Sequence, residues 1–204
     1  MKVLVAGVGN VLKADDGFGV EVARELANLD LPLCVRVVET GIGGIALVQE
    51  LQDGYDAVVV VDAVDHGRAP GTVMLIEPEV VDVGLLEPIA RHDLLADMHL
   101  ATPERVLMLA RALGVLPPRV LLVGCQPVDA DAVGEGLSDA VRTAVAVAVA
   151  EIVSHVNELA LMPASSAGPA GLASAAGPAS AAGPASAAGP TGSAGSASAG
   201  RRAL

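Results

Sequence analysis

The chain has few cysteines and few basic residues, and both shortages limit what it can be. Its 204 residues include two cysteines, Cys34 and Cys125, each inside an apolar run. A disulfide framework is therefore not expected, and two reduced thiols are typical of a cytoplasmic protein. The 12 Lys and Arg residues are outnumbered by 24 Asp and Glu residues. A surface this acidic argues against nucleic acid or an anionic membrane as partner, but it suits a cationic partner or a metal.

Several segments and motifs are also missing. The most apolar stretch, residues 140–153, is interrupted by Arg142 and Glu151, so it predicts a packed helix and not a membrane span. The N-terminus shows no small-residue cleavage site of a signal peptide. The HExxH motif is absent, which argues against an autonomous zinc protease. No Ser-His-Asp or Cys-His arrangement is evident, because Cys125 has no base near it in the sequence.

The last part of the chain lacks charge. No charged residue occurs between Pro163 and Gly200, and nearly all residues there are Ala, Gly, Ser or Pro. Such a segment can bury too little apolar surface to offset the entropy lost on ordering. We therefore predict one folded domain over residues 1–161 and a disordered tail over residues 162–204.

The remaining sequence indicates an α/β fold. Short β-branched runs alternate with helical patterns, so we predict a three-layer sandwich with a mostly parallel, twisted, five-stranded sheet and helices on both faces. The link at residues 65–71 shows no helical pattern and predicts one antiparallel strand, at an edge. The expected strands span residues 2–6, 33–39, 56–64, 71–77 and 119–125. The expected helices span residues 18–29, 44–51 and 138–158, and one further helix begins at residue 102.

The opening segment, VLVAGVGNVLKADDGFGVEVARELA, leaves two interpretations open. An apolar strand followed by Gly7 and Gly9 begins as a nucleotide-binding turn does. However, the third glycine of that motif is missing, and Asp15 and Asp16 would face the phosphates. A nucleotide-binding α/β module without protease activity is therefore the alternative function, and a tight turn is the other explanation of the glycines. One of the two acids is also expected to cap the helix that begins near residue 17.

Two acids and a histidine predict a metal site at one sheet edge. Asp16 follows the first strand and Asp62 ends the third, and such sheets bind ligands beyond the carboxyl ends of their strands. Two carboxylates and one imidazole suit Zn²⁺ or Ni²⁺. Without a cation, the carboxylates would raise each other's pKa. The candidates for the third ligand are His66, His92 and His99.

Together these segments resemble the endopeptidases that mature NiFe hydrogenases by trimming the C-terminus of the large subunit. The resemblance covers about residues 1–149. The stretches that carry it are, in order, VLVAGVGNVLKADDGFG, ETGIGGIALV, VVVVDAV followed by APGTV, DMHLATPERVLMLARALG, and VLLVGCQP.

The resemblance implies a metal-dependent, aspartic-type endopeptidase. It assigns metal binding and catalysis to Asp16, Asp62 and His99, with His92 as the second choice for the histidine. It implies nickel that arrives within the substrate, the precursor of a NiFe-hydrogenase large subunit, while Zn²⁺ or Cd²⁺ can substitute in vitro. Removing a C-terminal peptide from that precursor would activate the hydrogenase. The turn after the second strand is expected to contact the substrate through Gly41, Gly43 and Gly44.

Overall fold

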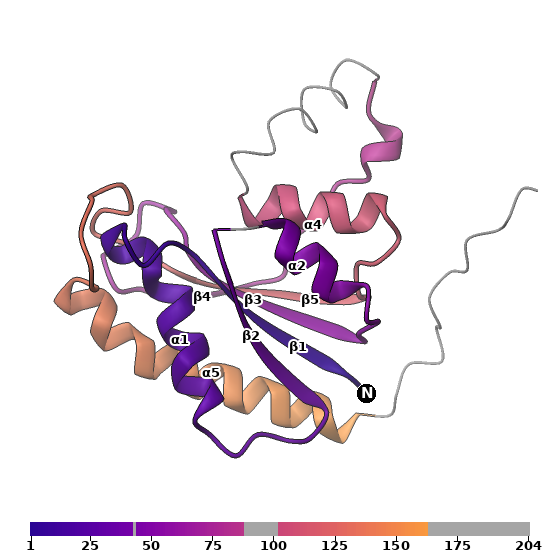
Figure 1. Cartoon of the computed structure of the whole chain (residues 1–204), viewed down its shortest axis with the longest axis horizontal. Coiled ribbons are helices and arrows are strands. Elements are labelled where there is room, and N and C mark those ends of the chain that lie inside the picture. Colours follow the sequence, from indigo (N-terminus) through magenta and orange to yellow (C-terminus); the bar gives the residue numbers. More distant parts are fainter. Residues whose placement is uncertain (43, 88–101, 163–204) are drawn as a thin grey trace, which may run out of the picture. The chain divides into compact units, whose positions relative to one another are not determined.

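The computed structural model describes residues 1–42, 44–87 and 102–162 (Figure 1). The division into a domain over residues 1–161 and a tail over residues 162–204 stays a prediction, because the description ends at Met162. In chain order the elements are β1 (Val3–Val8), η1 (Ala14–Gly17), α1 (Phe18–Ala27), β2 (Val35–Gly41), α2 (Gly44–Leu51), β3 (Ala57–Ala63), β4 (Val73–Ile76), η2 (Val83–Leu85), α4 (Pro103–Ala112), β5 (Arg119–Cys125) and α5 (Asp139–Leu161).

Within the described ranges the strands form a five-stranded sheet in the order β2-β1-β3-β5-β4. The first four strands of this order are parallel, and β4 pairs with β5 in the antiparallel sense. The predicted mixed sheet with one antiparallel edge strand is confirmed. Its cause is the short connection from β3 to β4, since a parallel connection needs a crossover of a dozen or more residues.

The alternation of side chains along the strands produces two apolar layers. Odd-numbered residues of β1 and β3, such as Val5 and Val59, pack with α1 and α5. Even-numbered residues of the same strands, such as Leu4 and Val60, pack with α2 and α4. Figure 1 shows the two helix pairs on opposite faces of the sheet. The predicted three-layer sandwich is therefore confirmed, and period-two alternation is its physical origin.

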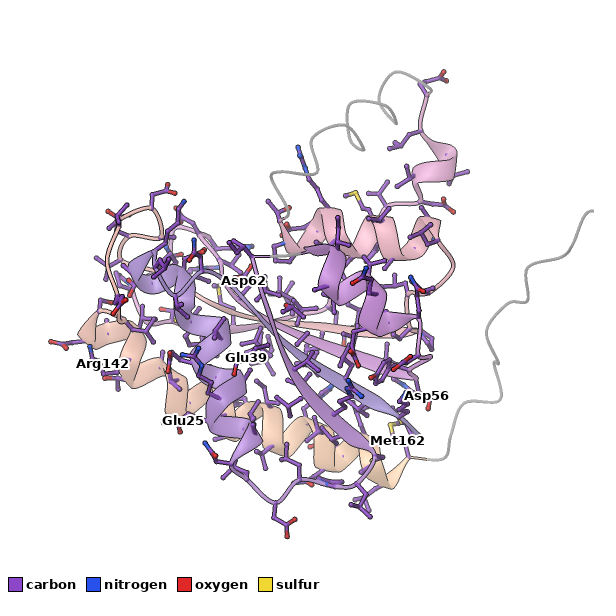
Figure 2. All side chains as sticks on the ribbon, in the orientation of Figure 1. Glu25, Glu39, Asp56, Asp62, Arg142 and Met162 are labelled. Carbon is purple, nitrogen blue, oxygen red and sulfur yellow. The ribbon has the colours of Figure 1, made fainter. Side chains whose placement is uncertain are left out.

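Helix α5 shares one face of the sheet with α1. It is the one helix of the described residues that is long and apolar enough to cross a membrane by length and composition. Its buried side chains recur at helical spacing and belong to the layer that α1 and the sheet share, so it is a core helix as predicted. Figure 2 labels Arg142 and Met162 near its two ends. The buried residues are Val141, Ala144, Val145, Ala148, Ile152, Val156 and Leu159.

Glycines let α1 press against the ends of β1 and β3. A Cβ atom on Gly7 would collide with the carbonyl oxygen of Gly19, and one on Gly19 would collide with the carbonyl oxygen of Val61. Gly9 has φ of 132°, a conformation that glycine alone adopts readily. The Gly-x-Gly turn therefore serves close packing, and it brings η1, which carries Asp16, beside the end of β3.

Candidate active site

The carboxyl ends of four parallel strands meet at one edge of the sheet. The turns after β1 and β2 are in direct contact there, because the Gly9 N–H donates to the Gly41 carbonyl at 3.1 Å. The link from β3 to β4 returns to the same edge, where Val73 pairs with Cys125. This edge holds the described site residues Asp16 and Asp62, at the position that parallel sheets use for ligands.

Asp62 is the more deeply placed carboxyl. It lies near the end of β3, where Figure 2 labels it at the opposite end of the sheet from Asp56. Its exposed fraction is 7%, and its Oδ1 accepts a hydrogen bond from the N–H of Ala63 at 2.9 Å. Burial raises the pKa of Asp62 to about 8, with further upward contributions from the charges of Asp16 and Glu104. The fold thus holds a buried acid next to other acids.

Asp16 lies in η1 and is half-buried. Its Oδ2 accepts a hydrogen bond from the N–H of Asn10 at 2.9 Å. Burial raises the pKa of Asp16, and the charge of Asp131 adds to the rise, while the Asn10 N–H and the charge of Lys13 oppose it. Asp16 and Asp62 are close enough for the charge of one to raise the pKa of the other. Such a pair favours either a shared proton or a bound cation.

The third ligand of the predicted metal site is not among the described residues. His92 and His99 both lie outside them. His66 is exposed in the link after β3, and the described residues contain no group of three His, Cys, Asp or Glu side chains able to hold a metal. His66 is therefore wrong as the partner of Asp16 and Asp62, because its side chain does not converge with them.

Asp15 has a different role from Asp16, and the predicted cap is wrong. Neither acid caps α1, whose N-cap residue Gly17 makes no side-chain capping bond. Instead, the buried carboxylate of Asp15 accepts hydrogen bonds from the N–H of Val128 and from both the N–H and the hydroxyl of Ser138. Ser138 is the N-cap residue of α5. Asp15 therefore joins η1 to the start of α5.

Gln126 is a buried polar residue that sequence reasoning missed. Its Oε1 accepts hydrogen bonds from the N–H groups of His66 and Arg68, and its Nε2 donates to Asp65 at 3.0 Å. This side chain, only 6% exposed, fixes the link between β3 and β4 at the site edge. The one available signal was a polar residue placed directly after the apolar strand β5.

Three N–H groups of the turn after β1 are already bonded within the protein. The N–H of Gly9 is bonded to Gly41, that of Asn10 to Asp16, and that of Leu12 to the side chain of Asn10. A phosphate-binding turn directs such N–H groups at its ligand. With these donors occupied and Asp16 adjacent, the turn does not suit a nucleotide.

A cysteine nucleophile is also unsuited to this site. Cys125 is fully buried at the end of β5. Burial raises the pKa of its thiol to about 11, and the charge of Asp15 adds to the rise. The thiolate is the nucleophilic form of cysteine, so Cys125 is inert at neutral pH.

The glycines predicted to contact substrate lie on the turn after β2. Gly41 has φ of 57° and faces open space at its Cα, while Gly44 is buried at the start of α2. Gly43 lies outside the described residues. Their contact with substrate stays a prediction.

This chain is similar to several known proteins in sequence and in fold. A family model for hydrogenase maturation protease matches residues 20–155. The hydrogenase expression/formation protein HupD of Rhodobacter capsulatus is 36% identical over 153 residues, which cover 74% of this chain and 70% of that protein. The hydrogenase 2 maturation peptidase of Thaumarchaeota archaeon SCGC_AB-539-E09 is 34% identical, with a TM-score of 0.55 over 76% of this chain and 98% of that one. An endopeptidase from Escherichia coli is 27% identical, with a TM-score of 0.63 over 78% and 94%.

Proposed function

Because this chain belongs to the hydrogenase maturation protease family, we propose that it removes a C-terminal peptide from the nickel-loaded precursor of a NiFe-hydrogenase large subunit. Membership makes it an endopeptidase and a hydrolase. The metal dependence, the nickel-loaded substrate and a cytoplasmic location belong to the proposal. Cleavage completes the large subunit, so the protein acts as an activator of another enzyme.

The main support for metal dependence is that two acids, Asp16 and Asp62, are neighbours. Burial raises the pKa of Asp62, and the negative charges of Asp16 and Glu104 raise it further. Among the described residues, no Lys or Arg forms an ion pair with Asp16 or Asp62. A divalent cation would remove the repulsion between the two carboxylates and return both to their charged forms. The donor set therefore fits a cation such as Ni²⁺, Zn²⁺ or Cd²⁺.

We assign the third ligand to His99. Helix α4 begins at Pro103, and its first-turn residue Glu104 is close enough to raise the pKa of Asp62. His99 is four residues before Pro103, so the chain allows a separation of at most about 14 Å between their Cα atoms. His92 is eleven residues before Pro103, so the length of chain between them limits the separation of their Cα atoms much less. The position of α4 therefore favours His99.

In the proposed reaction the precursor brings nickel to Asp16, Asp62 and His99. A cation held by these residues would polarise the scissile carbonyl or activate a water molecule. The protein's own contribution is to hold two carboxylates in a partly buried position, where electrostatic interactions are strong. Without nickel in the precursor, one carboxyl stays protonated and the site is incomplete. Cleavage is thereby restricted to precursors that have received their metal.

The substrate reaches this site across the turns at the carboxyl edge of the sheet. We propose that Gly41, Gly43 and Gly44 allow the substrate backbone to approach, since the Gly41 Cα faces open space. The formal net charge of −12 favours a cationic, nickel-bearing segment over an acidic one. The nucleotide-binding alternative gains no support, because the N–H groups of Gly9, Asn10 and Leu12 are already bonded and Asp16 lies beside them.

The test is cleavage of a cognate precursor prepared with and without nickel. Intact-mass measurement should show loss of a C-terminal peptide from the nickel-loaded form alone. Asp16→Ala, Asp62→Ala and His99→Ala should each abolish the mass loss, whereas His66→Ala, the matched control, should retain it. Equal cleavage of the nickel-free precursor would refute nickel dependence, and no cleavage of a confirmed cognate precursor would refute the activity.

A further inference from the structure

We propose that Asp15 is a positioning residue, which sets where the Asp16 carboxylate lies by holding η1 against the segment between β5 and α5. The inference rests on the proposed function only in taking Asp16 as a site residue. The two adjacent acids then have separate tasks: Asp15 faces the protein interior and fixes the turn, while Asp16 faces the site.

Both oxygens of Asp15 are engaged by one distant segment. Oδ1 accepts from the Ser138 N–H at 2.7 Å, and Oδ2 accepts from the Val128 N–H at 2.8 Å and from the Ser138 hydroxyl at 3.0 Å. Asp15 is 1% exposed, so water does not compete for these bonds. The donors lie at opposite ends of the segment 128–138, so a single carboxylate fastens both ends.

The same segment also pairs with η1 on its outer side. The Ala14 N–H donates to the Gly134 carbonyl at 2.7 Å, and the Gly134 N–H donates to the Leu12 carbonyl at 3.0 Å. The ion pair of Lys13 with Asp131 at 3.2 Å is largely exposed, so it adds little. Asp15 is thus a buried polar attachment between η1 and this segment.

The turn needs such an attachment because its backbone is strained. Ala14 has φ of 37°, a left-handed conformation that a residue with a Cβ rarely adopts. Strained backbone of this kind persists where surrounding contacts enforce it. The next two residues are Asp15 and Asp16, and the Asp16 carboxylate is in turn bonded to Asn10. Releasing Asp15 would let the turn relax and move Asp16 away from Asp62.

The test compares Asp15→Asn with Val156→Ala in the full-length chain. Asn has the shape of Asp but presents a donor in place of one acceptor, so it cannot satisfy all three donors. Val156 is a buried residue of α5 near the end opposite Ser138, so its truncation destabilises the same helix without touching η1. The first readout is amide hydrogen exchange at Asn10, whose N–H bonds to Asp16. The second is the separate measurement of kcat and KM on the nickel-loaded precursor.

Asp15→Asn should speed exchange at Asn10 by about tenfold or more relative to Val156→Ala. It should lower kcat by about tenfold with KM changed less than about twofold, as expected when the site is misplaced but substrate still docks. Exchange and kcat equal to those of Val156→Ala would overturn the proposal. If Asp15→Asn does not fold, Ser138→Ala removes only the hydroxyl bond, and the same comparison decides. If the wild type cleaves no precursor, the proposed function fails, while exchange at Asn10 still decides the role of Asp15.

Discussion

Replacing Asp62 by Asn should stabilise the metal-free protein, and by more as the pH rises. The folded-state pKa of Asp62 is about 8, against an ordinary value of 3.8. Because the folded pKa is raised, the folded protein holds a proton that the unfolded chain has lost between these two values. Stability is thus unaffected by this group below pH 4, falls as the pH rises towards 8, and is lowest above it.

The magnitude follows from the difference between the two pKa values. At 1.36 kcal/mol for each pKa unit, the full penalty has a ceiling of about 6 kcal/mol. Structural relaxation and water entry reduce such penalties, so we expect Asp62→Asn to gain at least about 2 kcal/mol at pH 8.5. At pH 4 the Asp is protonated in the folded state and resembles Asn, so the gain should nearly vanish.

The assay is urea unfolding at several pH values with a chelator present. Asp65→Asn is the matched control, because Asp65 is exposed and its pKa is lowered by the Gln126 hydrogen bond, a shift of opposite sign. The control should show no gain between pH 5 and 8. Saturating Ni²⁺ should reverse the order and favour the wild type, since a ligand stabilises the state that binds it. A gain that does not change with pH, or a loss at pH 8.5, would refute the reasoning.

Three further predictions concern the packing of α1, the link between β3 and β4, and the tail. Gly19→Ala should lower the free energy of unfolding in urea by about 2 kcal/mol or more, because its Cβ collides with Val61; Gly134→Ala, which has open space, should change it by less than about 0.5 kcal/mol. Gln126→Ala should raise the pKa of Asp65 towards its ordinary value in an NMR titration, and an unchanged pKa would contradict the hydrogen-bond assignment. Deleting residues 163–204 should leave the melting temperature within about 2 °C, and a loss beyond about 5 °C would show that the tail supports the fold.

Local features of the sequence predicted most of the fold. The β3 strand follows from its run of valines, and the antiparallel edge strand follows from a link too short for a crossover helix. Boundaries were less accurate. The first strand was expected to end at Ala6 and continues to Val8, because Val8 still pairs with Gly41 after a shift in register. Such an extension depends on the neighbouring strand and leaves no local signal.

Only those parts of the candidate site that have a local signal in the sequence could be predicted. Asp62 was identifiable because an acid directly after buried valines lies at a strand end. The role of Asp15 was not identifiable, since its partners Val128 and Ser138 are more than a hundred residues away. Because Asp15 lies next to the start of α1, the sequence suggests a cap of that helix. Only the folded structure shows that Asp15 binds the start of α5 instead.

The attachment of Asp15 to α5 means that two neighbouring positions tolerate substitution differently. A change at residue 15 disturbs the beginning of a 23-residue core helix, so it would reduce the amount of folded protein in a cell as well as its activity. A change at residue 16 removes an acid whose pKa is already raised by burial, so we expect the abundance of the protein to hold and the proposed processing to stop. We therefore expect folding to limit substitution at position 15 and the proposed chemistry to limit it at position 16.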